Sequence, residues 1–263
     1  MKELTLVKLG GSLITDKSKP YTVRQETLER MAREIKESGN KNLIVAHGQG
    51  SFGHQPAHEY QIQKGIVNEK SYKGLSIVQD VAAKLNRIVV EAFIKNGLNA
   101  ITVQPSCSAV CKNGRIINWN LEPIEQMLEH NQLPIPYGDI GFDLKMGCCI
   151  ISADEIMNYF ARNMKVDRII MVGKVDGVMT ADPNKNRSAE LIREVTTKNY
   201  SKIKSSLTGS DGVDVTGGML SKVERMLELA KLGIESEIIN GDKPGYLKRA
   251  LMGERGLGTV IKR

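Results

Sequence analysis

Apolar positions recur along the chain with the spacing of strands and of helices in turn. Residues 4–9 form a short apolar run, and residues 24–38 carry apolar side chains on one helical face before Gly39. A second apolar run, LIVAHG, follows at 43–48. Because a strand, a helix and a strand in this order normally build a parallel βαβ unit, the pattern predicts an α/β fold.

The remaining sequence continues this alternation without an internal repeat. Helical spacing predicts a long helix over 70–97, and Asn113 followed by Gly114 is typical of a tight hairpin turn within 111–118. Further strands are predicted at 100–105, 148–152, 168–173, 236–240 and 258–263, and further helices near 121–130, at 153–164 and at 217–232. Polar residues at 13–22 and 181–190 predict surface loops.

Composition fits a globular protein of ordinary kind. The chain has 263 residues, of which 41% are hydrophobic and 25% are charged, so it needs no disulfide or metal to stabilise its core. Its formal net charge of +7 indicates either a solvated basic surface or a field that attracts anionic substrates such as nucleotides. A nucleic-acid partner is disfavoured, since there is no arginine-rich arm and aromatic residues make up only 5%.

The cysteines and the chain start bear on metals and location. Cys107, Cys111, Cys148 and Cys149 lack the C-x2-C spacing typical of zinc sites, and no metal-binding residues are expected. The adjacent pair at 148 and 149 lies in an apolar run, which is typical of small core residues. No secretory signal pattern and no apolar run of about 18 residues is visible, so we expect a cytoplasmic protein without a membrane partner.

Two glycine-rich loops are the main candidates for chemistry. KLGGS, residues 8–12, ends the first predicted strand, and HGQGSFGH, residues 47–54, ends the second. Glycines let a phosphate approach the backbone N–H groups closely, although a glycine-rich strand end without a ligand is the alternative for each loop taken alone. Because neighbouring parallel strands end at one edge of a sheet, we expect the two loops to lie side by side and to hold two phosphorylated ligands.

Other charged residues are weaker signals when taken singly. Lys17 follows the first loop, Asp154 begins a predicted helix, and Lys222 lies in the helix opened by TGGMLSK. Each could be an ordinary surface residue or helix cap, and VDGV at 175–178 could be an ordinary tight turn. A lysine near a phosphate can neutralise the charge that develops during phosphoryl transfer, so their order along one chain indicates a kinase.

In this order, KLGGS, HGQGSFGH, GDIGFD, ISADE, VDGVMTADP and TGGMLSK resemble the amino acid kinase superfamily from residue 7 to about 222. SFGH with its histidine resembles the isopentenyl phosphate kinase branch. The resemblance implies an open αβα sandwich with a mainly parallel central sheet. In this one continuous domain, residues 1–146 would form an acceptor-binding lobe and 147–263 an ATP-binding lobe. It also implies phosphorylation of isopentenyl phosphate to isopentenyl diphosphate by ATP, which binds with Mg²⁺, and a homodimer.

The resemblance assigns roles to individual residues. Lys8 and Lys222 would contact the transferring phosphoryl group, Asp154 would orient both lysines, and Lys17 would contact phosphates at the reaction centre. His54 is counted with these four as catalytic. The residues expected to bind ATP are Lys8, Gly10, Gly11, Ser12, Gly50, Asp176, Gly177, Met179, Asp182, Gly217 and Lys222. Those expected to bind the acceptor are Gly48, Gln49, Gly50, His54 and Gly147.

The chain departs from the usual family pattern in two motifs. Gln49 stands where the second loop usually has glycine, and a backbone N–H contact survives this change only if φ at residue 49 is negative. The usual SGDD is SADE here, which puts Ala153 and Glu155 on either side of the retained Asp154.

Two other functions compete with this interpretation. One is a fosfomycin-type or other small phosphate or phosphonate kinase, since fosfomycin-resistance kinases share the loop histidine. An isoprenoid acceptor would need an apolar pocket, for which Ile77, Val78, Val81 and Phe93 are candidates, unless they are ordinary core residues. The other is a non-catalytic nucleotide-binding regulator, against which the joint presence of the lysines and Asp154 argues.

Overall fold

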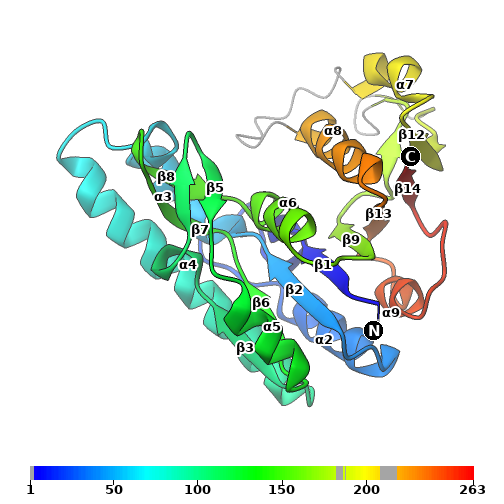
Figure 1. Ribbon diagram of the computed structural model, residues 1–263, viewed down its shortest axis with the longest axis horizontal. Coiled ribbons are helices and arrows are strands. Elements are labelled where there is room, and N and C mark those ends of the chain that lie inside the picture. The colour runs from blue at the N-terminus through cyan, green and yellow to red at the C-terminus, as the bar shows by residue number, and fades with distance from the viewer. Residues whose placement is uncertain (1–2, 182–185, 187, 208–217) are drawn as a thin grey trace.

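A six-stranded, mainly parallel sheet forms the centre of the molecule. The computed structural model describes residues 3–181, 186, 188–207 and 218–263 (Figure 1). The strand order is β12 (Glu194–Thr196), β14 (Thr259–Lys262), β13 (Glu235–Asn240), β9 (Arg168–Gly173), β1 (Thr5–Leu9) and β2 (Leu43–His47). Neighbours pair in parallel except β13 with β14. This confirms the α/β class and the mainly parallel sheet.

Helices cover both faces of this sheet, as expected for an open αβα sandwich. One hydrophobic core joins the sheet to α2 (Gln25–Ser38), α4 (Lys70–Lys95) and α9 (Tyr246–Leu251). A second core joins the opposite face to α6 (Ala153–Asn163) and α8 (Gly218–Lys231).

The side chains of β1 alternate between the two cores. Leu4 and Leu6 pack on the side of α6 and α8, whereas Val7 and Leu9 pack on the side of α2 and α4. Successive side chains of a strand point to opposite faces. Lys8 therefore shares the face of Leu6 and points toward α6 and α8, which fixes where its charge acts.

Additional strands extend the N-terminal half (Figure 1). β3 (Ala100–Val103) pairs in parallel with β6 (Leu133–Pro136), and α5 (Glu122–Glu129) precedes β6. A four-stranded sheet follows the order β5 (Arg115–Asn118), β4 (Val110–Lys112), β7 (Asp139–Asp143) and β8 (Gly147–Ile151). Smaller elements are the 3-10 helices Ile62–Lys64 and Pro105–Cys107, the strand pair β10 (Val178–Met179) and β11 (Leu191–Ile192), and α7 (Tyr200–Leu207).

The hairpin predicted within 111–118 is present between β4 and β5. Asn113 and Gly114 both have positive φ, +51° and +73°, as a two-residue hairpin turn requires. The backbone N–H groups of both residues donate to the Asp143 carboxylate, at 3.1 and 2.7 Å. The predicted boundary at 146/147 lies in the turn between β7 and β8, and the division into lobes stays a prediction.

Two predicted loops are partly helical, which corrects the sequence interpretation. α1 (Gly11–Ile14) begins inside the first glycine loop, and α3 (Gly50–Glu59) begins inside the second. Glycine and Pro56 have low helix propensity, so neither segment shows a helical signal. The hydroxyl oxygen of Thr15 accepts the N–H of Ser51 at 2.9 Å, so a residue from one loop satisfies the start of the helix in the other.

None of the helices in the described part of the chain is long and apolar enough to cross a membrane.

Candidate active site

The two glycine loops meet at the carboxyl ends of β1 and β2, as the sequence predicted. Their backbones are in direct contact, because a Cβ atom on Gly11 would lie 2.7 Å from Gly50 Cα. A Cβ on Gly48 would lie 3.0 Å from Gly11 N. Glycine at 11 is therefore required by packing between the loops. Gly50 also has a positive φ of +52°, which favours glycine for a separate reason.

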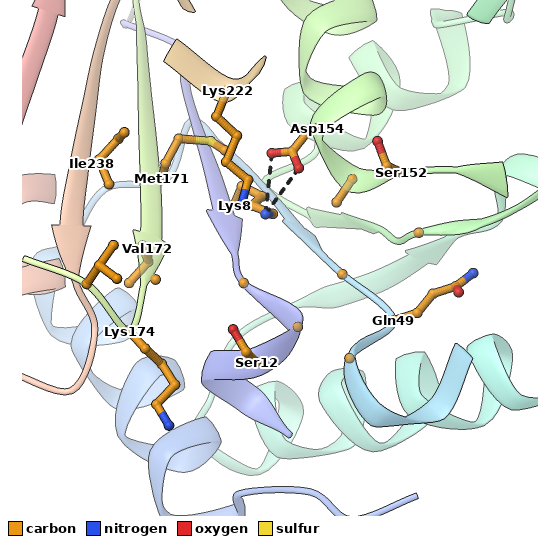
Figure 2. Close-up of a pocket in the computed structure, with 18 of the residues that line it drawn as sticks. Lys8, Ser12, Gln49, Ser152, Asp154, Met171, Val172, Lys174, Lys222 and Ile238 are labelled. Carbon is orange, nitrogen blue, oxygen red and sulfur yellow. Dashed lines mark hydrogen bonds and ion pairs between the residues drawn. The ribbon is translucent and has the colours of Figure 1, made fainter. Parts of the chain in front are cut away.

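A lysine–aspartate pair lies beside these loops. Lys8 Nζ is 3.3 Å from Asp154 Oδ1 and donates to Oδ2 over 3.4 Å, and both side chains are largely buried. Figure 2 shows Lys222 reaching from α8 toward the same pair. Asp154 takes this position because Ser152 caps α6, its side chain accepting the N–H of Glu155 at 3.1 Å. Strand β1 and helices α6 and α8 thus bring three charged groups together.

The positive charges around Asp154 decide its ionisation. Burial raises the pKa of this carboxyl, but the charges of Lys8 and Lys222, with a smaller contribution from Arg225, hold the pKa below its usual value. Asp154 therefore stays ionised and is a poor proton acceptor at neutral pH. Its buried Oδ1 accepts no hydrogen bond from a described residue. These features favour a role for Asp154 in orienting lysines over a role as a general base.

Two cavities share the walls of this site. The smaller, about 260 Å³, is bounded by the first glycine loop, by the end of β9 and by the start of α8. The larger, about 730 Å³, extends along α3 toward the β7–β8 sheet. The residues lining both are Lys17, Gln49, His54, Ile150, Ser152, Asp154 and Lys222. One continuous cleft therefore offers two compartments that meet at the charged groups.

The two histidines of the second loop occupy different surroundings. His47 is buried and stacks on Tyr137, its Nδ1 lies 3.1 Å from Gly48 O, and its Nε2 lies 3.1 Å from Asn86 Nδ2. Burial lowers the pKa of His47 to about 4, so this ring is neutral and structural. His54, by contrast, lines both cavities.

The residues present do not build a metal site of their own. Among the described residues there is no group of three or more histidine, cysteine, aspartate or glutamate side chains that could hold a metal ion. Asp154, a carboxylate that lines both cavities, is paired with Lys8. The arrangement instead suits two anionic ligands held by backbone N–H groups and lysines.

A sequence profile of the amino acid kinase family matches residues 3–240. The chain belongs to the amino acid kinase family. The match spans the segments that carry both glycine loops, the Lys8–Asp154 pair and Lys222.

Relatives within the amino acid kinase family indicate the branch to which this chain is most similar. The isopentenyl phosphate kinase of Methanothermobacter thermautotrophicus is 37% identical over 98% of this chain and 98% of its own length. That of Thermoplasma acidophilum is 32% identical over 98% and 100%. An acetylglutamate kinase from Pelagibacter ubique is only 26% identical over 99% and 88%. These values place the chain in the isopentenyl phosphate kinase branch.

Solved structures agree with this placement. An X-ray structure of isopentenyl phosphate kinase superposes with a TM-score of 0.85 at 34% identity, covering 98% of this chain and all of the other. A product complex of the T. acidophilum isopentenyl phosphate kinase gives a TM-score of 0.79 at 29% identity with the same coverage. The predicted amino acid kinase fold is thereby confirmed.

Most of the residues expected at the site line the cleft. Those on the smaller cavity are Lys8, Gly10, Gly11, Ser12, Lys17, Gly48, Gln49, Gly50, His54, Asp154 and Lys222. Gln49 has a φ of −72°, so the departure from glycine causes no backbone strain. Asp182 and Gly217 lie outside the described residues.

Four expected residues do not line either cavity. Asp176 Oδ1 accepts from Asn240 Nδ2 and pairs with Lys243 Nζ, both at 2.8 Å, and Gly177 packs against Thr259. Met179 is half-buried in β10. Gly147 has a φ of +77° and packs against Ile66. Their roles in ligand binding stay predictions.

The sequence left two interpretations open for the apolar residues of α4, prenyl-pocket lining or ordinary core. Val78, Val81 and Phe93 are buried in the cores, and neither they nor Ile77 line either of the two cavities described above. The apolar residues that do line the larger cavity are Pro20, Ala57, Met146, Cys149 and Ile150. Helical periodicity identifies the apolar face of α4, but that face packs against the sheet.

Sequence reasoning missed several residues of the cleft. Lys174 lines the smaller cavity, and Arg225 and Glu155 line the larger one. Lys174 directly follows β9, the strand next to β1, so the rule that ligands bind at the carboxyl ends of strands would have found it. No comparable signal marks Arg225, because it lies within an ordinary amphipathic helix.

Proposed function

We propose that this chain transfers the γ-phosphoryl group of ATP to isopentenyl phosphate and forms isopentenyl diphosphate and ADP. The observation that carries the proposal is the meeting of two compartments at Asp154 and Lys222, with Lys8 paired to Asp154 and with His54 lining both compartments. Membership of the isopentenyl phosphate kinase branch supports the same acceptor.

The chemistry needs alignment and charge neutralisation more than proton transfer. An oxygen of the acceptor phosphate attacks the γ-phosphorus, a new P–O–P bridge forms, and the bond between the γ-phosphorus and the bridging oxygen breaks to release ADP. A phosphate monoester is largely ionised at neutral pH, since its second pKa is about 6. It therefore requires no general base, which agrees with an Asp154 that is already charged and paired.

Each group has a role that follows from its place in the cleft. Lys8 and Lys222 neutralise the transferring phosphoryl group, and Asp154 orients both lysines. The N–H groups of Gly10, Gly11 and Ser12 cradle the ATP phosphates at the start of α1, and Lys17 contacts the phosphates at the reaction centre.

The acceptor phosphate binds to the second loop. The backbone around Gly48 and Gly50 and the side chains of Gln49 and His54 hold it. His54 donates a hydrogen bond, and the prenyl tail extends into the larger cavity. ATP would bring Mg²⁺ with it, and the metal would supply positive charge against the phosphates.

The location, oligomeric state and partners that we propose are those that the family resemblance implies. The protein is a cytoplasmic homodimer that acts on small molecules, and neither nucleic acid nor a membrane is a partner. Its net charge of +7 attracts two anionic substrates to the cleft.

A second candidate activity is phosphorylation of a small phosphonate such as fosfomycin. The observation in its favour is that the polar side chains of Gln55, His58 and Gln63 line the larger cavity together with its apolar residues. A short polar acceptor would contact these groups, whereas a prenyl tail would leave them without partners.

A panel of acceptors distinguishes these activities. ATP turnover would be measured with isopentenyl phosphate, dimethylallyl phosphate, fosfomycin, UMP and N-acetylglutamate, and products would be identified by ³¹P NMR. We expect kcat/KM to be highest with isopentenyl phosphate. Preferential turnover of fosfomycin would establish the second candidate, and turnover with UMP or N-acetylglutamate alone would overturn both. ATP binding without turnover of any acceptor would indicate a regulator.

A further inference from the structure

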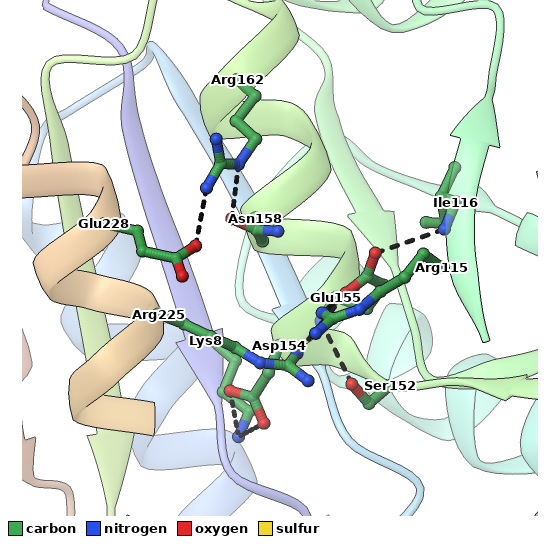
Figure 3. Close-up of polar contacts among 10 residues, drawn as sticks. All are labelled: Lys8, Arg115, Ile116, Ser152, Asp154, Glu155, Asn158, Arg162, Arg225 and Glu228. Atoms are coloured by element: carbon green, nitrogen blue, oxygen red, sulfur yellow. Dashed lines mark hydrogen bonds and ion pairs between the residues drawn. The ribbon is translucent and has the colours of Figure 1, made fainter. Parts of the chain in front are cut away.

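A buried carboxylate next to Asp154 connects three elements around the site. Glu155 Oε2 pairs with Arg115 Nη1 of β5 at 2.7 Å and with Arg225 Nη1 of α8 at 3.5 Å. Its Oε1 accepts the N–H of Ile116 at 3.2 Å. Only 7% of the Glu155 side chain is exposed. Figure 3 shows the Asp154 and Glu155 carboxylates diverging from the first turn of α6 toward different cations.

The position of Arg225 makes this contact relevant to catalysis. Arg225 follows Lys222 by three residues, so the two side chains lie about one turn apart on the same side of α8. Both line the larger cavity. Lys222 lies in the second turn of α8, so only about one helical turn precedes it to fix its position. A contact one turn farther on is therefore well placed to fix the approach of Lys222.

We propose that Glu155 and Arg225 are positioning residues that hold the start of α8 against α6, so that Lys222 meets the transferring phosphoryl group. Phosphoryl transfer depends on alignment, and a displacement of about 1 Å can cost roughly 10²-fold in rate. The Glu155–Arg225 ion pair acts on Lys222 through Arg225, which lies one turn away on α8. It acts on Asp154 through Glu155, which is the next residue on α6. The inference rests on the proposed kinase activity and adds a function for the glutamate of SADE.

The same two helices carry a matched control. Arg162 of α6 pairs with Glu228 of α8 at 2.9 Å, and the two side chains are 40% and 58% exposed. This pair is visible above the Glu155 contact in Figure 3. It joins α6 to α8 farther from Lys222. If holding the helices together were all that mattered, both pairs would act alike.

The test compares Arg225→Met with Arg162→Met in the full chain. Removing Arg225 leaves Glu155 paired with Arg115, so the buried charge keeps a partner and the fold is retained. We expect Arg225→Met to lower kcat about 10-fold, with KM for ATP and for isopentenyl phosphate changed less than about 3-fold. Arg162→Met should keep kcat within about 2-fold. Thermal unfolding of both variants monitors folding.

A double-mutant cycle then separates positioning from direct contact with substrate. In the Lys222→Ala background, Arg225→Met should lower kcat by no more than about 2-fold, because the group that it positions is gone. An undiminished 10-fold loss in that background would overturn the proposal and show that Arg225 contacts the substrate itself. Equal losses from Arg162→Met and Arg225→Met would also overturn it. Lack of isopentenyl phosphate turnover by the wild-type protein would instead refute the proposed function.

Discussion

The two glycine loops end neighbouring parallel strands, yet they differ at their turns. In the first loop, Gly10 and Gly11 present only backbone to the cleft, and a Cβ on Gly11 would collide with Gly50. In the second, Gln49 places a side chain on both cavities without backbone strain, and His54 follows one turn into α3. A cradle for the phosphates common to all nucleotides needs only N–H groups. A loop that selects an acceptor needs side chains as well.

The lysines between the loops should have the largest effect on rate. Lys8→Ala and Lys222→Ala should each lower kcat about 10²-fold or more, because each removes a preorganised charge from the transferring phosphoryl group. The measurement is steady-state turnover at saturating ATP and isopentenyl phosphate. A near-wild-type kcat in either variant would remove that lysine from the mechanism.

The steric difference between the loops can be tested by an alanine substitution in each. The substitution adds a methyl group at Gly11 and shortens the side chain at Gln49. Gly11→Ala should lower kcat/KM for both substrates by about 10²-fold, because the added Cβ pushes the two loops apart and misaligns both anions. Gln49→Ala, in the other loop, should change kcat/KM by less than about 10-fold. If Gly11→Ala retained wild-type activity, the close packing of the loops would have no functional importance.

His54 tests whether the second loop orients its ligand or transfers a proton. Losing a hydrogen bond to a charged group costs about 1.5–3 kcal/mol, or roughly 10- to 150-fold. His54→Ala should therefore lower kcat/KM for isopentenyl phosphate by that factor, whereas His54→Gln keeps a donor and should retain clearly more activity. Equal inactivity of both variants at saturating substrate would mean that His54 transfers a proton.

The other histidine of this loop, His47, should affect the stability of the fold and not the rate of transfer. The unfolded chain takes up a proton on His47 near pH 6.5, whereas burial keeps the folded pKa at about 4. Stability should therefore fall as the pH decreases from about 6.5 to 4, by at most about 3 kcal/mol from this group. Urea unfolding at several pH values, compared between wild type and His47→Gln, isolates the contribution of His47 to the pH dependence of stability. An identical pH dependence in both would contradict it.

The sequence predicted the sheet, the helix layers and the meeting of the loops because these depend on local patterns. The apolar runs of β1 and β2 and the helical spacing of α2 and α4 are set within each segment. The side chains that complete the site depend on contacts between distant segments. Glu155 and Arg115 are separated by 39 other residues but bond at 2.7 Å, and no periodicity indicates such a pair.

The helix start that the sequence did not reveal and the role of α4 that it left open have the same origin. The start of α3 is satisfied by Thr15, from a segment that the local glycine-rich sequence cannot indicate. Val81 and Phe93 of α4 were candidates for a ligand pocket or for the core, and they pack in the core that joins α4 to the sheet. In both cases a contact with a distant segment determines the local structure. Amphipathic periodicity shows that an apolar face is covered, but it does not show what covers it.

The division of labour between the loops is tested most directly by binding without turnover. Calorimetric titration would measure Kd for isopentenyl phosphate and for a non-hydrolysable ATP analogue in wild type, His54→Ala and Ser12→Ala. We expect His54→Ala to raise Kd for isopentenyl phosphate about 10-fold or more and to leave the nucleotide Kd within about 2-fold. Ser12→Ala keeps the backbone N–H of residue 12, so it should leave the Kd of both ligands within about 2-fold. If His54→Ala weakened both ligands equally, or weakened the nucleotide alone, the two loops would not serve separate ligands.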